Sequence, residues 1–418
     1  MHASNMIEPA FPNDAELVGL MESVADLRVS AVRLCADAGE RSRVALSTLL
    51  RAMNSYYTNK IEGQHTLPAD LEAAMGRRFS DDEDVHRRQE LALAHMRLEA
   101  DLEPVCRQLG WPEQFEMAWL CRIHRELYEQ LPPQYRRVLD GEGNDRGALD
   151  PGGLREHDVR VGHHHAPPHE MLPDLLKHFA FRYGSDYNST SRKVVAAGAS
   201  MHRLSWIHPF ADGNGRVSRL HNHLLLTSLG LTNGLWSPMR GLARRHADYY
   251  SALAAADATR RNATDGLVNL SSSGLTTWLR FWLDICLDQV RFMSAQLGFQ
   301  TLEQRYISLA LQVTHDFGRG AAHHRSQLDP IKLGHALYQL FRSGSMERGV
   351  FKAWLGVPDR SASRLISHLL SIRLLSSASR TAHLESNFPF YSLRFLFPGL
   401  WPEAEGIAPP EAPKAAMD

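Results

Sequence analysis

Cysteine is scarce in this sequence, which has four cysteines in 418 residues and no Cys-x-x-Cys pair. They are Cys35, Cys106, Cys121 and Cys286. This spacing favours neither a zinc knuckle nor a disulfide framework, so we expect thiols in a reducing compartment. No stretch approaches the roughly 18 apolar residues of a membrane-spanning helix, and the N-terminus lacks the basic and apolar regions of a signal peptide. These absences predict a cytoplasmic protein without membrane contact.

An excess of charge of either sign is also missing, because 46 Lys and Arg residues face 47 Asp and Glu residues. The molecule as a whole is therefore not a polycation that holds nucleic acid, although a local basic segment can be hidden in the sum. A hydrophobic fraction of 44% with 22% charged residues excludes a wholly disordered or collagen-like chain. The length predicts about two to three domains.

Helical patterns cover most of the chain, and we predict an all-α fold with one short β-hairpin and a small C-terminal domain. Residues 1–110 have few prolines and few β-branched runs, which predicts an N-terminal helical region. Residues 111–298 predict a helical core. Within it, Asp158–His169 cannot be helical, because a Val-Arg-Val-Gly stretch and two prolines fill it, and it predicts an exposed hairpin.

The C-terminal part of the sequence has a different character. A glycine-, histidine- and serine-containing stretch predicts a linker region over residues 299–330, and residues 402–418, rich in Pro, Ala and Glu, predict a disordered tail. Residues 331–400 hold nine basic and three acidic residues, a net charge of +6. A short helix, a break at Pro358 and a longer helix outline a helix-turn-helix with a wing after it, so 331–401 predict a small domain.

The most informative segment is IHPFADGNGRVSR, residues 207–219. Gly213 and Gly215 flank an asparagine just ahead of the apolar periodicity of a helix, so the segment predicts a tight loop that opens into a helix N-terminus. Such a loop directs backbone N–H groups outward. Together with the positive end of the helix dipole, these groups form an anion site that suits phosphate.

Four side chains of this segment have the chemistry of phosphoryl transfer. Arg216 and Arg219 stand three positions apart on one helix face, where two guanidinium groups can clamp a polyphosphate. Asp212 supplies one hard oxygen ligand, which suits a Mg²⁺ held mainly by nucleotide phosphates. His208, whose side chain has an ordinary pKa of about 6.5, can take a proton from an incoming hydroxyl.

The segment resembles the signature of the Fic family, His-x-Phe-x-Asp/Glu-Gly-Asn-Gly-Arg-x-x-Arg, with every fixed position filled. The resemblance implies an all-α core that binds ATP and Mg²⁺ and transfers AMP to a Ser, Thr or Tyr hydroxyl of a target protein, a reaction called AMPylation. By position, it makes His208 the general base and Asp212 the Mg²⁺ ligand. The phosphates would be bound by Gly213, Asn214, Gly215, Arg216 and Arg219.

Two further segments extend the resemblance over roughly residues 50–290. The first resembles the flap of the family, a hairpin that positions the target by strand-like pairing. It comprises Val161, Gly162, His163 and His164. The second contains Tyr250, which stands where relatives place an aromatic residue on the adenine side. Asp257 departs from the pattern, because some relatives have an adenine-contacting Asn at this place.

An upstream segment, residues 58–63, resembles the inhibitory motif of the family, Ser/Thr-x-x-x-Glu-Gly/Asn. Thr58 and Glu62 lie one helical turn apart and so face the same neighbour, and Gly63 can end the helix. The resemblance implies that Glu62 pairs with Arg219. The pair would deny this guanidinium to the γ-phosphate and make the enzyme autoinhibited.

Several alternatives stay open at this point. The same site can remove AMP from a modified protein, or it can sense nucleotide in a DNA-binding regulator. A zinc cluster is an alternative for His163, His164, His165 and His169, although no HExxH or paired-thiolate spacing accompanies them.

The basic C-terminal domain also has more than one interpretation. It resembles the winged helix-turn-helix appendage of several bacterial Fic proteins, which would place Arg360, Ser361 and Arg364 on a DNA-facing helix. The same domain can dock a protein or form a homodimer. A solvated, arginine-bearing surface without a partner is the neutral interpretation.

Overall fold

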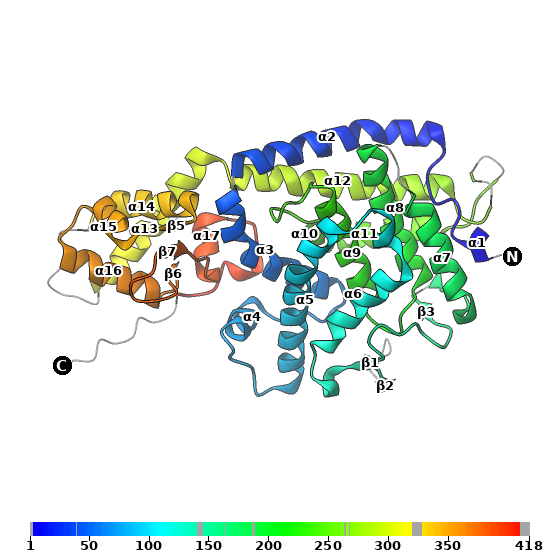
Figure 1. The fold of residues 1–418 in the computed structure, drawn as a ribbon, viewed down its shortest axis with the longest axis horizontal. Helices are drawn as coiled ribbons and strands as arrows, with labels where there is room; N and C mark the ends of the chain where they lie inside the picture. Colours follow the sequence, from blue (N-terminus) through cyan, green and yellow to red (C-terminus); the bar gives the residue numbers. More distant parts are fainter. Residues whose placement is uncertain are drawn as a thin grey trace. The chain divides into compact units, whose positions relative to one another are not determined.

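The computed structural model describes residues 3–409, except 39, 140–144, 163, 186–188, 263–264, 267 and 320–327. These residues are mainly α-helical with a few very short strands, so the predicted all-α fold is confirmed (Figure 1). The chain divides into two compact units. The first comprises Met1–Val32, Arg51–Thr66 and Phe79–Arg291, and the second comprises Arg33–Leu50, Leu67–Arg78 and Phe292–Asp418.

The first unit contains segments from both the predicted N-terminal region and the predicted core, which therefore fold together. Its elements within the described residues are α1 (Ala3–Met6), α5 (Glu83–Gln108), α6 (Met117–Glu129), α7 (Leu172–Tyr183), α8 (Thr190–Ile207), α9 (Asn214–Ser228), α10 (Met239–Arg244), α11 (His246–Asp257), the hairpins β1 (Arg137–Leu139) with β2 (Asp145–Ala148) and β3 (Arg160–Val161) with β4 (His164–His165). Three helices contribute residues to both units: α2 (Asp14–Ala38), α3 (Glu40–Ile61) and α12 (Ser272–Gln296).

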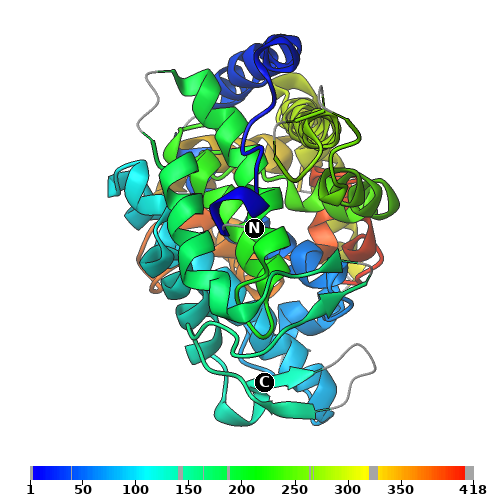
Figure 2. The same ribbon diagram turned by 90° about the vertical axis from the view of Figure 1, so that its right-hand side faces the viewer.

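Helices α7, α8 and α9 form the centre of the first unit, and α7 and α8 run side by side (Figure 2). From Val194 on, nearly all of α8 is buried, and α12 packs on it through Trp278 and Trp282, both fully buried. A Cβ on Gly198 of α8 would lie 2.6 Å from the Trp282 ring, so only glycine permits this approach. The Trp278 Nε1–H donates to the Gly198 carbonyl at 2.8 Å. This packing fixes the ends of α8 and α9, between which the signature segment lies.

The second unit is built on two packed helices, α13 (Phe299–Arg319) and α14 (Pro330–Ser343). A Cβ on Gly334 would come within 2.6 Å of the Ile307 backbone, so the two helices touch closely. The remaining elements are α4 (Pro68–Met75), β5 (Ser345–Met346), α15 (Arg348–Leu355), α16 (Asp359–Ser371), β6 (Leu375–Ser376), β7 (Leu384–Ser386) and α17 (Leu393–Leu396). The strands form an antiparallel sheet in the order β5-β7-β6.

Two predictions about the C-terminal part need correction. Residues 299–319 are not a linker but the helix α13, whose buried face carries Leu302, Tyr306 and Val313 at helical spacing. The predicted tail begins with a 3-10 turn at Pro402–Ala404, in which Ala404 is buried. Residues 320–327 and 410–418 lie outside the described residues.

Three of the four cysteines, Cys106, Cys121 and Cys286, are buried. Among the described residues, no helix combines the length and the apolar character that crossing a membrane requires.

Candidate active site

The signature segment forms a loop that ends α8 and begins α9. His208 ends α8 in the left-handed conformation, with φ of 52°, and Pro209 cannot continue the helix. Gly213 has φ of 79°, and α9 begins at the next residue. The Asn214 side chain clamps the loop, because it accepts from the Phe210 N–H at 2.9 Å and donates to the Phe210 carbonyl at 2.8 Å. Its amide thus holds the loop, while the N–H groups of the first turn of α9 have no partner within the helix.

The His208 imidazole has the tautomer that a general base needs. Its Nδ1 lies 3.3 Å from the Ser205 carbonyl oxygen, which can only accept, so Nδ1–H donates and Nε2 keeps a lone pair. Burial lowers the pKa of His208 to about 4, so the ring is neutral at neutral pH. Arg155 holds the backbone at this point, because its Nε donates to the His208 carbonyl at 2.8 Å.

Arg219 is buried and bonded to the segment that resembles the inhibitory motif. Its Nε donates to Thr58 Oγ1 at 2.8 Å, and its Nη2 donates to Glu62 Oε1 at 2.5 Å. Burial would lower the pKa of Arg219, but the Glu62 carboxylate outweighs it and raises that pKa. The predicted pairing of Glu62 with Arg219 is thus present, and Thr58 faces the same guanidinium.

Glu62 lies directly on the N-terminus of α9. A Cβ on Gly215 would meet Glu62 Oε1 at 2.2 Å, so the carboxylate rests against the Gly215 backbone. Burial would raise the pKa of Glu62, but Arg219 and Arg216 outweigh burial and hold this pKa below its usual value. Gly63, with φ of 68°, ends the preceding helix α3, so the chain turns immediately after the carboxylate. The carboxylate therefore occupies the anion site that the sequence predicts for phosphate.

Arg216 is held by a second set of partners. Its Nη1 donates to Gln64 Oε1 at 2.8 Å and its Nη2 to the Tyr128 hydroxyl at 2.8 Å, and Nη2 lies 3.2 Å from Asp212 Oδ2. Both predicted clamp arginines are thus occupied by protein groups. A phosphate must replace these partners before it can bind both guanidinium groups.

Asp212 has the properties of a single Mg²⁺ ligand. Its side chain is 29% exposed, and Oδ1 accepts from the Gly213 N–H at 2.6 Å. One accessible carboxylate fits Mg²⁺ only together with phosphate oxygens, which supply the remaining hard ligands of this ion. A carboxylate of this kind fits the ion chemically, and the Mg²⁺ role of Asp212 stays a prediction.

A cavity of about 370 Å³ opens beside this loop. Gly215, Arg219, Glu62 and His208 line one part of it. Its other described lining residues are Val161, Gly162, His164, His202, Ser205, Trp206, Tyr249, Tyr250, Leu253, Ala254 and Asp257. Arg216 and Asp212, by contrast, are not among these lining residues. Tyr250 lines this cavity and is 46% exposed, and its contact with adenine stays a prediction.

The predicted flap is the hairpin of β3 and β4, with Val161 opposite His164. Val161 is 44% exposed, and Gly162 makes the turn with φ of 58°. His164 Nε2 lies 2.8 Å from the Trp206 carbonyl, which ties the flap to the end of α8. His163 lies outside the described residues.

The histidines proposed as a zinc alternative have separate partners where the structure describes them. His164 contacts the Trp206 carbonyl, whereas His169 Nδ1 lies 3.0 Å from Asp158. These two rings therefore do not converge on a common ion.

Four residues of the site were not predicted from the sequence. Tyr249 hydrogen-bonds Arg219, Tyr128 bonds Arg216, and Arg155 and His124 hold the loop backbone. His124 also stacks on Phe210 with ring centroids 4.1 Å apart. They lie far from the signature in sequence, and only the unusual burial of polar side chains identifies them.

Together, these observations define a helical protein with a loop that opens into a helix N-terminus, a neutral histidine and a cavity of about 370 Å³. Residues 114–226 match the model of the Fic/DOC family. This part of the chain is therefore similar to the Fic/DOC family.

The relatives with curated names match the same part of the chain. The protein adenylyltransferase Fic of Drosophila willistoni is 34% identical over 111 residues, which are 26% of this chain and 22% of the relative. The protein of the same name from Drosophila melanogaster is 33% identical over 111 residues, 26% of this chain and 23% of the relative. The match thus spans less than a quarter of these relatives.

Solved structures of similar proteins cover more of the chain at lower identity. A Fic family protein from Desulfovibrio desulfuricans G20 is 17% identical, covers 88% of this chain and 96% of its own, and has a TM-score of 0.48. Fic-1 (residues 134–508) from C. elegans is 18% identical, covers 67% of this chain and 72% of its own, and has a TM-score of 0.47.

Proposed function

We propose that this protein transfers AMP from ATP to a Ser, Thr or Tyr hydroxyl of a target protein. One observation carries the proposal: His208, with a free Nε2, lines the same cavity as Gly215 and Arg219 at the N-terminus of α9. The names of the Fic-domain relatives, protein adenylyltransferases, support it. The cavity volume of about 370 Å³ lies in the range of small-molecule sites.

The proposed reaction needs one proton transfer and one displacement at phosphorus. The target hydroxyl gives its proton to His208 Nε2 while its oxygen bonds to the α-phosphorus, and the bond to the leaving pyrophosphate breaks. The Nδ1–H bond to the Ser205 carbonyl keeps the ring oriented during this step. The N–H groups at the start of α9 stabilise the phosphate oxygens. When Mg²⁺ is bound, Asp212 would hold it and the ion would offset phosphate charge.

The flap supplies a place for the target segment. Val161 is exposed on a strand that, within the described part of the chain, pairs only with β4, and the hairpin borders the cavity. An extended target segment can add to such an edge by main-chain hydrogen bonds, which would bring its hydroxyl toward His208.

We infer that the described conformation is self-inhibited. The Glu62 carboxylate contacts Arg219 and rests on Gly215, so it takes both the guanidinium and the helix N-terminus that a phosphate needs. Holding the competent state near 1% takes only about 2.7 kcal/mol. A largely buried charge-assisted hydrogen bond supplies an energy of this order.

The test is transfer of label from α-labelled ATP to the protein itself and to a cell lysate. Glu62→Gly removes the competing carboxylate and should raise labelling by at least about tenfold. Adding His208→Ala should return labelling to background, because general-base catalysis typically supplies about 10² to 10⁴ in rate. Lys60→Gly is the matched control, since it weakens the same helical turn but leaves the carboxylate in place.

Persistent labelling in the double variant would remove His208 from the reaction. Equal labelling of the Glu62→Gly and Lys60→Gly variants would remove the inhibitory role of the carboxylate. Intact mass measured after exposure to each nucleotide triphosphate identifies the transferred group and so decides whether ATP is the donor.

The reverse reaction is a second candidate, because Glu62 and His208 line the same cavity and Glu62 is 31% exposed there. In this reading, the carboxylate orients a water that hydrolyses AMP from a modified protein. Incubating the wild type and the Glu62→Gln variant with an AMP-modified target, and measuring the AMP released, distinguishes removal of AMP from its transfer. Release of AMP by the wild type alone would favour hydrolysis.

The element order of the second unit favours DNA binding as an additional function. Helix α14, strand β5, helices α15 and α16, and strands β6 and β7 follow one another as in a winged helix-turn-helix. Arg360 and Arg364 are exposed on α16, and Ser361 is half-buried beside them. A salt-dependent mobility shift of DNA that is lost in an Arg360→Ala/Arg364→Ala variant would support it. Binding that is unchanged by these substitutions would place any DNA contact elsewhere.

A further inference from the structure

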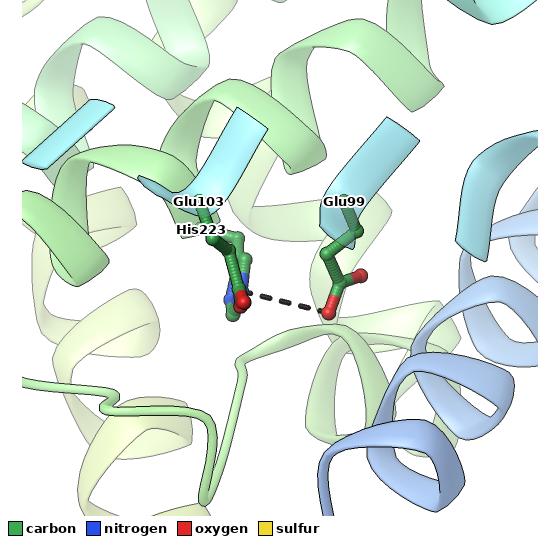
Figure 3. A group of neighbouring side chains, drawn as sticks. All are labelled: Glu99, Glu103 and His223. Atoms are coloured by element: carbon green, nitrogen blue, oxygen red, sulfur yellow. Dashed lines mark hydrogen bonds and ion pairs between the residues drawn. The ribbon is translucent and has the colours of Figure 1, made fainter. Parts of the chain in front are cut away.

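A second group of functional side chains is buried in the first unit, outside the cavity. Glu99 and Glu103 lie one turn apart on α5, and His223 approaches them from α9 (Figure 3). His223 Nε2 lies 3.2 Å from Glu103 Oε1 and 3.6 Å from Glu99 Oε1. All three side chains are at most 6% exposed. None of them takes part in the proposed reaction.

The hydrogen bonds around this group leave buried ligand atoms unused. Glu103 Oε2 pairs with Arg51 at 2.6 Å, and Glu99 Oε1 accepts from Asn54 at 2.8 Å. Glu99 Oε2 has no hydrogen-bond partner among the described residues, although its atom is buried. Both ring nitrogens of His95 are also buried without a hydrogen-bond partner among these residues, and Nδ1 lies 3.9 Å from Glu99 Oε2. Leaving such atoms unsatisfied destabilises the fold.

Charge gives a second argument. Two carboxylates and a single guanidinium meet beside His223 in a nearly water-free place. The charge of the second carboxylate must be balanced there by a proton on the cluster or by a metal ion. A metal ion can replace that proton, because it binds ionised carboxylates and a neutral imidazole.

The ligand atoms have the spacing and chemistry of a transition-metal site. Bonds of about 2.0–2.2 Å in a tetrahedral site place neighbouring ligand atoms about 3.4 Å apart. The 3.2 and 3.6 Å separations bracket this value. Imidazole nitrogen mixed with carboxylate oxygen suits Zn²⁺ and its neighbours, whereas Ca²⁺ and Mg²⁺ prefer oxygen alone.

We infer that Glu99, Glu103 and His223 form a buried site for a divalent transition-metal ion. The ion would join α5 to α9, the helix that carries Arg216 and Arg219. Through Arg51 and Asn54, it would also fix the docking of α3, which leads to Glu62. Its role is structural, and it does not depend on the proposed transfer reaction.

The experiment is metal analysis of the full-length chain produced in medium supplemented with Zn²⁺ and, separately, with Co²⁺. After dialysis against a weak chelator, we expect close to one equivalent of metal per wild-type chain. Glu99→Gln should lower this at least tenfold, and it is the mildest variant because a glutamine can keep the contact to Asn54. Asp158→Asn is the matched control: it alters the group of Asp158, His169 and Glu170, which is exposed or half-exposed, and should leave the metal content unchanged.

The wild type alone keeps the inference testable if the variants do not fold, as judged by circular dichroism. Co²⁺ held by histidine nitrogen and carboxylates in a closed site gives the intense visible bands of four-coordinate cobalt. A wild-type chain that is metal-free from both media, or that carries cobalt with only the weak bands of the hydrated ion, overturns the site. Metal lost in Asp158→Asn rather than in Glu99→Gln also overturns it.

Discussion

At the scale of single residues, one carboxylate competes with the proposed substrate for the same groups. Glu62 bonds the Arg219 guanidinium and contacts the Gly215 backbone. A triphosphate would use both groups, so these two contacts of Glu62 are sufficient to block the site. Removing the carboxylate leaves the guanidinium held by Thr58, which keeps it oriented toward the cavity.

Arg155 should act as a positioning residue. Its buried guanidinium donates to the carbonyls of His208, His157 and Pro167 at 2.8, 2.9 and 2.5 Å, a fork that lysine cannot reproduce. In the Glu62→Gly background, we expect Arg155→Lys to lower kcat by about tenfold or more with little change in KM for ATP. Steady-state kinetics measures this, and a rise in KM at unchanged kcat would contradict it.

Tyr250 should contribute to nucleotide affinity through its ring. Its side chain is half-exposed in the cavity, and base stacking on an aromatic ring is worth about 1–3 kcal/mol. In the Glu62→Gly background, Tyr250→Ala should raise KM for ATP by about 5- to 100-fold. Tyr250→Phe keeps the ring and should stay near the parent value. Equal values for both variants would show that no base stacks there.

At the scale of elements, the α8–loop–α9 turn is stabilised by glycine geometry as well as by side chains. Gly213 adopts φ of 79°, and a Cβ there would approach the Tyr128 hydroxyl at 2.5 Å. Tyr128 in turn bonds Arg216. The Tyr128 side chain therefore lies against the Gly213 backbone and also bonds Arg216, so it links the turn to helix α9.

Gly213→Ala should be more destabilising than an equivalent change at the other end of α9. Gly230 also has a left-handed backbone, with φ of 70°, but a Cβ there meets nothing within 4 Å. Gly230→Ala should therefore cost only the backbone strain, about 1–2 kcal/mol. Gly213→Ala should cost at least about 1 kcal/mol more, because Tyr128 must move. Chemical denaturation of both variants measures the difference, and equal losses would rule out the steric contribution.

At the scale of the whole molecule, the site residues all belong to the first unit, which also contains a set of buried neutral histidines. Burial lowers the pKa of His208 and of His221 to about 4 each, and it lowers the pKa of His202 as well. His221 is fully buried, with Nε2 2.7 Å from the Gln114 carbonyl.

Acid should destabilise the fold through these rings. The unfolded chain protonates a histidine near pH 6.5, whereas the folded chain protonates His208 and His221 only near pH 4. The folded state thus binds fewer protons between these values, so the free energy of unfolding falls as the pH is lowered from about 6.5 to 4. Calorimetry of thermal unfolding at pH 5, in buffers of different ionisation enthalpy, measures proton uptake. Unfolding should take up close to one proton for each of the two histidines. No uptake difference between the wild type and His221→Gln would contradict this.

Much of the local structure could be predicted from the sequence, because it depends on neighbours along the chain. The turn at 208–214, the start of α9 and the end of α3 at Gly63 follow from glycine, proline and helical spacing. The second unit was predicted less well. The prediction of a linker over residues 299–319 was wrong. It followed the nearby glycine and histidine stretch and overlooked the apolar residues at helical spacing on α13.

The sequence by itself determined the chemistry available at the turn. One histidine, one aspartate and two arginines lie within twelve residues, around the N-terminus of a helix. Only the tertiary structure decided which groups these residues meet. Glu62 reaches Arg219 across 157 positions, and Glu103 reaches His223 across 120. Such contacts depend on how whole helices pack, and packing is set by the burial of apolar faces over many residues rather than by the local pattern of any one segment.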